Sequence, residues 1–449
     1  MSKEDEQNSF KSLVNYNGDI VNLDIIYFNT QHVNVITLDT FINLDIEENV
    51  QSPFYSGVLT IKNENNSFDT MKSVPLPESE ILNIDFLETG ENYIYVKFQT
   101  DYITKEYVFN ISKEFESVER NTKAKNFVLI DYHLWYMMYS KANFSSTFIL
   151  EGDTTQLSDK DRMSNTSDSI KKLLIDNVDK GCIDENYWTK SNTDSFYSSN
   201  YQDSILVALN KLLESTLDNN DDSMLLLKRK NKYGLYSLSK MYNNFISNNY
   251  YDNYGGTFSL GTDLGNPETN LTLNSIKVNN FSLLNENGKN TLENLTNYKV
   301  FNYDYKGKKF NIYNEQNTIE KTVDHIEETY LNKKTHINRT ANNNITKNRY
   351  YQTYYSTEIN DNIISIEGRQ EILKNMMKYS TALNLKTEGL LSIDTGNFII
   401  VSHDPIKINK NLRKLNGGWF VYGLRHSFSV KDFRTEVACT KFYEIKKDE

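Results

Sequence analysis

Cysteine and proline are scarce in this 449-residue sequence, which contains two cysteines and five prolines. Cys182 and Cys439 are too few and too far apart to build a disulfide framework or a zinc cluster. We expect both to be reduced, partly buried thiols. No stretch reaches the roughly 18 apolar residues of a membrane helix, and the charged start lacks the apolar segment of a secretion signal. The sequence therefore predicts neither a membrane span nor a secretion signal.

Basic residues are fewer than acidic ones, so the formal net charge is -11 and the pI is about 5.3. This net negative charge excludes a protein that binds nucleic acid over its whole surface, although a local basic patch stays possible. The length suits roughly two to four domains, which is enough chain to bury real cores.

Recognisable catalytic motifs are missing as well. No two of the six histidines have the spacing of a zinc-protease helix, and no G-x-S-x-G elbow occurs. The glycines between Tyr250 and Asn270 lack the Lys-Ser/Thr pair of a phosphate loop, which predicts a plain surface loop. A group of acidic residues lacks a calcium-loop pattern and is interpreted as solvated carboxylates: Glu151, Asp153, Asp159 and Asp161. The sequence thus indicates no catalytic, metal or cofactor-binding residue, and only a carboxylate pair that meets in the fold stays open.

The first part of the chain, residues 1–112, is strand-like after a tail that ends near Lys11. Short alternating runs such as V-I-T-L-D-T-F-I-N-L-D-I and Y-I-Y-V-K-F-Q-T are separated by polar breaks, one of them just after Ile61. Several such runs without a helix signal predict a small antiparallel barrel or sandwich.

The middle part, residues 113–248, predicts an α+β unit. Helices are expected near 167–178 and 203–216, because apolar residues recur there at helical spacing. A hairpin is expected near 224–238, with its basic turn at Lys230-Asn231-Lys232. The aromatic and Met cluster from Leu134 to Tyr139 is apolar on all sides, which favours a buried core helix.

Residues 249–380 predict further strands, a polar insertion at 318–348 and a helix near 369–379. Residues 381–449 predict an antiparallel β-module in which apolar side chains recur at every second position. This alternation links Trp419 with Val421, Phe428 with Val430, and Phe433 with Thr435, Val437 and Cys439.

Two further features of this module carry predictions. Asn416-Gly417-Gly418 is a turn signal, because glycine adopts a positive φ without steric cost. His426 lies in an alternating strand, which favours a packing or hydrogen-bonding histidine over a catalytic one.

Four stretches, in this order, resemble the baseplate hub or tail hub proteins of contractile-tailed bacteriophages, which are related to the hub part of type VI secretion spike proteins. The first stretch is N-V-Q-S-P-F-Y-S-G-V-L-T-I with the strands that follow it, and the second is S-I-K-K-L-L through L-L-L-K-R-K-N-K-Y-G-L-Y-S-L. The third is N-L-K-T-E-G with G-N-F-I-I-V, and the fourth is G-G-W-F-V-Y-G-L-R-H-S-F with F-R-T-E-V. The residues that carry this hub signature are Phe54, Gly57, Gly389, Gly396, Gly418, Trp419, Val421, His426, Phe428, Phe433 and Thr435.

The resemblance implies a mainly β fold with two tube-like antiparallel β-barrels, residues 1–112 and a second barrel closed by 381–449, plus inserted helical and mixed domains. It implies a homotrimer whose six barrels form a pseudo-sixfold ring between the sixfold tail tube and a threefold central spike. The implied partners are the tail tube protein, the spike protein, other baseplate proteins and DNA in transit, with no cofactor and no enzymatic activity. It also implies a place in the virion tail after assembly in the host cytoplasm.

Other readings stay open at this point. The same barrels serve hubs of non-contractile tails and secretion-like injection machines, and no residue distinguishes these from contractile tails. An all-β polysaccharide-binding or polysaccharide-degrading tail protein would need an aromatic row or two carboxylates in a cleft. A cell-wall hydrolase would need a Cys-His or Glu-Asp signature, which the sequence does not display. If three copies assemble, we hypothesise that part of the acidity lines the channel and repels passing DNA.

Overall fold

The computed structural model is mainly β, which confirms the predicted class. Its described residues form 24 strands and three helices. They are residues 13–14, 20–28, 32–37, 39–63, 74–75, 92–119, 122–141, 164–178, 181–192, 194–195, 204–214, 216–218, 224–229, 231–238, 240–241, 254–260, 275–284, 299–304, 309–313, 351–354, 381–403 and 415–441.

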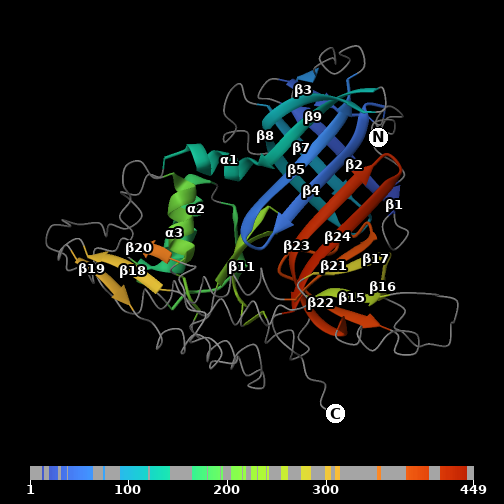
Figure 1. Cartoon of the computed structure of the whole chain (residues 1–449). Coiled ribbons are helices and arrows are strands. Elements are labelled where there is room, and N and C mark those ends of the chain that lie inside the picture. Colours follow the sequence, from blue (N-terminus) through green and yellow to red (C-terminus); the bar gives the residue numbers. More distant parts are fainter. Residues whose placement is uncertain are drawn as a thin grey trace.

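The N-terminal strands form one half of a large mixed sheet (Figure 1). They are β1 (Leu13–Val14), β2 (Ile20–Phe28), β3 (His32–Val35), β4 (Phe41–Asn49), β5 (Ser52–Lys62), β6 (Val74–Pro75), β7 (Tyr93–Gln99), β8 (Thr104–Glu119) and β9 (Thr122–Asp131). Their order in the sheet is β4-β5-β9-β8-β7-β2-β3-β6, with antiparallel neighbours throughout.

The C-terminal strands continue the same sheet. They are β15 (Tyr254–Leu260), β16 (Ser275–Val278), β17 (Asn280–Leu284), β21 (Thr381–Glu388), β22 (Phe398–His403), β23 (Gly417–Ser429) and β24 (Asp432–Lys441). The long strand β23 pairs with β24 on one side, and on the other side with β22 and then with β4. The antiparallel β4–β23 pairing, called the junction below, joins the first and last parts of the chain side by side (Figure 1).

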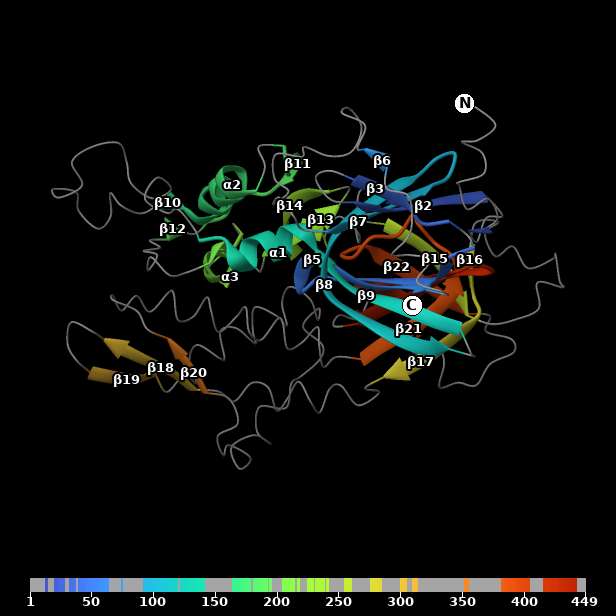
Figure 2. The ribbon, with the colours of Figure 1, turned by 90° about the horizontal axis from the view of Figure 1, so that it is seen from above.

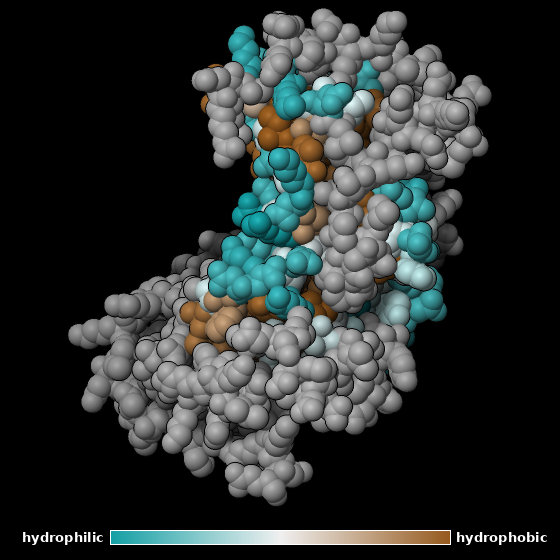
Figure 3. All heavy atoms as spheres, turned by 90° about the vertical axis from the view of Figure 1, so that its right-hand side faces the viewer, coloured by the Kyte–Doolittle hydropathy of each residue, from teal (hydrophilic) through white to brown (hydrophobic). Residues whose placement is uncertain are grey.

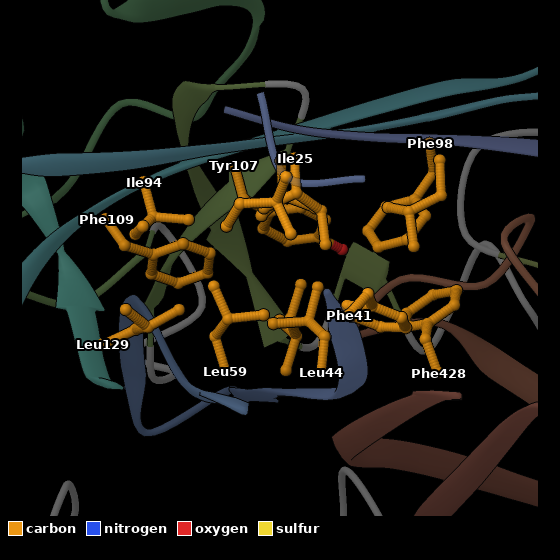
Figure 4. Packing of buried hydrophobic residues seen from close by; sticks show 14 of the residues in the cluster. Ile25, Phe41, Leu44, Leu59, Ile94, Phe98, Tyr107, Phe109, Leu129 and Phe428 are labelled. Carbon is orange, nitrogen blue, oxygen red and sulfur yellow. The ribbon is translucent and has the colours of Figure 1, made fainter. Parts of the chain in front are cut away.

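Each half of the sheet has its own apolar core. In the N-terminal half, side chains from β2, β7 and β8 face those from β4, β5 and β9, and Phe98 lies beside Phe428 from β23 (Figure 4). The second core lies between β15, β16, β21, β22, β23 and β24 and includes Trp419 and Val437. Because β23 and β24 contribute to both cores, the two halves are packed as well as hydrogen-bonded together.

The middle unit lies beside the N-terminal half of the sheet (Figure 2). It contains α1 (Tyr132–Tyr139), β10 (Ser164–Asn165), α2 (Thr166–Asn177), β11 (Ile183–Trp188), β12 (Asp194–Ser195), α3 (Ile205–Glu214), β13 (Met224–Arg229) and β14 (Lys232–Ser237). Asn165 caps α2 by accepting a hydrogen bond from the Ser167 amide, as N-cap residues do. The predicted helices and hairpin are confirmed, and Asn231 supplies the positive φ at the hairpin turn.

A separate three-stranded sheet contains β18 (Lys299–Asp304), β19 (Lys309–Tyr313) and β20 (Tyr351–Tyr354). The predicted insertion at 318–348 and the predicted helix near 369–379 lie outside the described residues, as do Glu151, Asp153, Asp159 and Asp161. In the view onto the right-hand side of Figure 1, hydrophilic side chains form a band between smaller hydrophobic patches (Figure 3).

The two halves of the large sheet contain an internal repeat. β9 and β24 are both 10 residues long, and each begins after a two-residue turn from a long strand, β8 or β23. Each long strand carries one bulge, at Ser112 in β8 and at Tyr422 in β23. Counted from the turn, these two bulges occupy the same position. The register then matches strand by strand, with β5 equivalent to β21 and β4 equivalent to β17.

Three predictions about local structure are wrong. The supposed surface loop after Tyr250 contains β15, whose Phe258 is fully buried between parallel strands. Helix α1 is not buried all round, because only His133 and Met137 are buried and Tyr139 is exposed. Val430 lies outside β23, in the turn before β24, so the alternation of that strand ends at Phe428.

Strand β8 also continues past residue 112, where the first domain was predicted to end, and β9 belongs to the same sheet. The other predicted domain boundaries stay predictions.

Candidate functional site

Several hub-signature residues meet at the junction. The rings of Phe98, Phe428 and Phe433 stack in series, with centroid distances of 4.1 Å for each neighbouring pair. Phe433 in turn lies directly against Gly389, where a Cβ atom would come within 1.8 Å of the ring. Only glycine fits at this position without moving the ring or the backbone.

His426 and Thr435 belong to the same group and are both fully buried. The Thr435 hydroxyl accepts a hydrogen bond from the Leu390 amide at 2.9 Å and lies 3.1 Å from Nδ1 of His426. The prediction of a packing and hydrogen-bonding histidine is therefore confirmed. Among the described residues, Nε2 of His426 has no hydrogen-bond partner, and it faces Glu48 Oε1 at 3.9 Å.

The remaining signature residues are spread over the fold. The rings of Phe54 and Tyr233 of the middle unit form a T-shaped pair, and Gly57 lets β5 approach the Asp45 carbonyl. Gly396 has a φ of +81°. The others lie at the start of β23: Gly418, then Trp419, whose indole donates to the Leu415 carbonyl, and Val421 in the second core.

The predicted Asn416-Gly417-Gly418 turn takes a different form. Gly417 has the positive φ that the signal requires, with a value of 114°, but β23 already begins at this residue.

Buried and partly buried ionisable side chains form what we call the charged joint: Glu48, Lys105, Asp394, Arg229 and His426. Lys105 Nζ lies 2.9 Å from Asp394 and 3.8 Å from Glu48, and it donates to the Ile393 carbonyl at 2.8 Å. Arg229 from the middle unit donates to the Thr395 carbonyl at 3.0 Å. The joint thus ties together the N-terminal sheet, the middle unit and the C-terminal segment.

Burial and charge pairing shift the pKa values of four groups in this joint. Burial raises the pKa of Glu48, which also accepts a hydrogen bond from the Tyr107 hydroxyl at 2.8 Å. Burial disfavours the charged forms of both Lys105 and Asp394, but the opposite charge of each residue stabilises the other. The pKa of Lys105 is therefore raised, and the pKa of Asp394 is lowered. Burial lowers the pKa of His426 well below its usual range, with a further contribution from Lys105.

A second buried group surrounds Lys228 and is called the lysine cage below. Its ammonium lies 2.7 Å from Asp131 Oδ2 and sits over the rings of Tyr55, Tyr132 and Tyr233 at 5.0 to 5.7 Å. Such ring faces attract cations. The Tyr55 hydroxyl donates to the Lys228 carbonyl at 2.9 Å, so β5 of the sheet and β13 of the middle unit are held together.

His133 completes the cage. Asp131 caps α1 by accepting from the His133 amide at 2.9 Å, and His133 Nδ1 lies 2.7 Å from the Tyr233 hydroxyl. Burial, aided by the Lys228 charge, lowers the pKa of His133 well below its usual range. Burial also lowers the pKa of Lys228, although the Asp131 carboxylate counteracts part of this effect.

Most acid and base side chains of the two groups are too deeply buried for chemistry on a substrate. A general acid or base must come within hydrogen-bond reach of the group that it protonates or deprotonates. Glu48, His426, Asp131 and His133 are all nearly or fully inaccessible to solvent. Among the described residues, no group of three or more His, Cys, Asp and Glu side chains could hold a metal ion. What these side chains can do is fix three parts of the chain relative to one another.

Sequence reasoning missed the charged joint and the lysine cage. A signal was present, because the charged members occupy inward positions in alternating strands. Glu48 follows Leu44 and Ile46 at period two, and Asp131 follows Phe127 and Leu129 in the same way. A charge at such a position predicts a buried partner, but the sequence does not identify that partner.

The sequence matches no protein-family model and no curated protein. Among solved structures, it is similar to a tail protein from Neisseria meningitidis MC58, with 9% identity, a TM-score of 0.48, and coverage of 93% of this chain and 96% of that chain. It is also similar to the 43 kDa tail protein of prophage MuSo2 from Shewanella oneidensis, with 8% identity, a TM-score of 0.49, and coverage of 93% and 98%.

A third similar structure is an Escherichia coli component of the type VI secretion system, with 10% identity, a TM-score of 0.38, and coverage of 91% and 76%. These are proteins of the kinds that the sequence signature resembles. In the described part of the chain, no helix is both long and apolar enough to cross a membrane. The function proposed below rests on contacts within this chain.

Proposed function

We propose that this protein is a structural hub of a phage tail baseplate. Three copies form a pseudo-sixfold ring that joins the tail tube to the central spike and lets DNA pass. The observation that carries the proposal is the internal repeat, in which two β-units of one chain share bulge position, turn length and register. A ring that matches a sixfold tube needs six near-equivalent units, and three chains supply them when each contributes two.

The buried contacts support a scaffold. A ring element under load must keep its parts in one arrangement, and a buried charge pair penalises arrangements in which either charge loses its partner. The charged joint and the lysine cage place such pairs where the sheet meets the middle unit and the C-terminal segment.

The face of the junction that points away from both cores supports a channel lining. Arg425, Lys386 and Arg434 lie on it, and each has a carboxylate partner on the same face. These partners are Asp45, Glu47, Glu436 and Asp432, so carboxylates outnumber cations. Cations already paired in this way are poorly available to phosphate, and the excess negative charge repels it. A neutral or positive potential over the channel wall of an assembled ring would overturn this part of the proposal.

The proposal covers contractile and non-contractile tails alike, because the same six units serve both. The polysaccharide-active alternative gains no support from the two deeply buried carboxylates. Glu48 and Asp131 are paired with lysines and shielded from sugar rings.

Light scattering on the purified protein tests the proposal directly, with the 52.4 kDa chain as the unit. A threefold mass, followed by ring-shaped particles in electron micrographs, is the expected result. A monomer that stays monomeric when the candidate spike protein is added would contradict the trimeric hub. Clearing of host peptidoglycan in a halo assay would favour a hydrolase instead.

A further inference from the structure

Several strand edges of the large sheet have a partner on one side only, among the strand pairings that the described residues make, and two of them are related by the internal repeat. Among the described strands, the second half of β8, from Lys113 to Glu119, pairs with β9 alone. In the same part of the chain, β17 pairs with β21 alone. Unpaired edges expose amide and carbonyl groups and act as templates for another strand.

The internal repeat identifies what these edges correspond to. The second half of β23, Gly423–Ser429, is equivalent to Lys113–Glu119 of β8, since both follow the bulge and lead into the two-residue turn. Residues 43–47 of β4 are equivalent to β17, because both pair in the same register with equivalent strands, β5 and β21. The edges of β23 and β4 pair with each other within the chain and form the junction.

We propose that the free edge of β8 in one copy pairs antiparallel with the free edge of β17 in a second copy, repeating the junction between chains. The proposal rests on the hub function above and specifies how its chains join. The register follows from the junction, where Phe428 pairs with Leu44 and Ser427 with Asp45. Translated through the repeat, these pairs become Val118 with Phe281 and Ser117 with Ser282.

Exposure of apolar side chains supports this surface. Val118 is 73% exposed and Phe115 is 44% exposed, although both lie in a regular strand. The equivalent of Val118 in the junction is Phe428, which is 1% exposed and stacked between two rings. A single isolated exposed residue needs no explanation, but apolar residues on an unpaired edge mark a contact surface.

Charge is also compatible with this pairing. The β8 edge carries Glu114, Glu116 and Glu119 against a single Lys113, so two β8 edges repel each other. Strand β17 reads N-F-S-L-L and carries no charge. The β8 edge therefore pairs with β17 without like charges facing each other, which favours a head-to-tail ring over a two-fold dimer.

Cysteine cross-linking tests the register. Ser117→Cys and Ser282→Cys exchange one small side chain for another, and the native Cys182 and Cys439 are buried. A mixture of the two single variants should form a disulfide-linked dimer on mild oxidation, because partners that face each other across two strands lie within disulfide reach. The double variant should form higher covalent species. Ser117→Cys mixed with Asn280→Cys, two residues out of register, is the matched control and should cross-link at least tenfold more slowly.

A second variant tests the surface without relying on cysteine. Val118→Lys places a charge at the proposed contact, while Tyr102→Lys changes a side chain that is 84% exposed in a turn outside the contact. We expect Val118→Lys to weaken self-association about tenfold or more and Tyr102→Lys to leave it unchanged.

The outcomes separate this inference from the hub function. A threefold mass without the Ser117–Ser282 cross-link, and with Val118→Lys still trimeric, would overturn the β8–β17 pairing and leave the hub intact. A protein that is monomeric at all accessible concentrations and forms no cross-link would overturn both.

Discussion

The hairpins β8–β9 and β23–β24 have the same turn length, bulge position and second-strand length, yet they have different surroundings. Beyond its bulge, β23 meets β4, and Phe428 becomes part of a three-ring stack. Beyond its bulge, β8 meets β9 alone among the strands that the structure describes, and Val118 is exposed. The two hairpins therefore share one backbone geometry. The type and burial of their side chains differ according to whether a neighbouring strand of the same chain covers the edge.

The largest effect should come from truncating the two equivalent residues. Phe428→Ala removes the middle ring of a buried stack and should lower the free energy of unfolding by about 3–5 kcal/mol. Val118→Ala at the equivalent exposed position should change it by less than about 0.5 kcal/mol in the unassembled chain. Urea unfolding followed by circular dichroism measures both. Equal losses would mean that the two hairpins have similar surroundings.

Charge pairs allow a second comparison, between the charged joint and the outward face. Lys105→Met leaves the buried Glu48 and the partly exposed Asp394 without this cation, which should cost about 1–3 kcal/mol. Lys386→Met removes the partner of Glu436 in a half-exposed pair and should cost about 0–1 kcal/mol. The same urea titrations apply. A small effect of Lys105→Met would show that the joint does not hold the sheet and the C-terminal segment together.

Two glycines of the C-terminal half allow a third comparison, in which each variant adds a single methyl group. Gly389→Ala drives a Cβ into the Phe433 ring and should cost about 1–3 kcal/mol. At Gly423, the nearest atom to an added Cβ is 3.5 Å away, so Gly423→Ala should be neutral or slightly stabilising, within about 1 kcal/mol. Thermal unfolding of the two variants side by side distinguishes these outcomes, and a neutral Gly389→Ala would mean that the ring moves freely.

The smallest effect is a pH dependence that originates in the lysine cage. The unfolded chain takes up a proton on His133 near pH 6.5, whereas the folded chain resists protonation because its pKa is lowered. Stability from His133 is therefore complete above about pH 6.5 and is lost as the pH falls below it, by at most about 1.4 kcal/mol per pH unit.

Unfolding free energies between pH 5 and 7.5, compared with those of His133→Gln, measure this contribution. The variant should have the shallower dependence, and an identical slope would contradict the assignment. His133 is a cleaner probe than His426, because the raised pKa of Glu48 beside His426 acts in the opposite direction.

Most strands and the three helices follow from local patterns in the sequence, and the period-two run through Phe433, Thr435, Val437 and Cys439 is buried as predicted. The strand β15 was missed because its glycines suggested a loop, whereas burial between parallel neighbours tolerates them. The partners of Glu48 and Lys228 could not be predicted, because they lie far away in the sequence and meet only in the fold. The internal repeat could not be recognised from the sequence either. The strand register and the bulge position repeat, but the side chains at equivalent positions, such as Val118 and Phe428, differ.

The junction also sets the order in which the molecule is completed. Ser427 and Asp45, which share a hydrogen bond across it, are 382 residues apart. During synthesis, β4 therefore emerges long before its partner, and its free edge waits until β23 has left the ribosome. Contacts of such long range form slowly, and a waiting edge can pair with the wrong chain in the meantime. Efficient production of this protein should accordingly depend on low temperature or on a chaperone that shields β4.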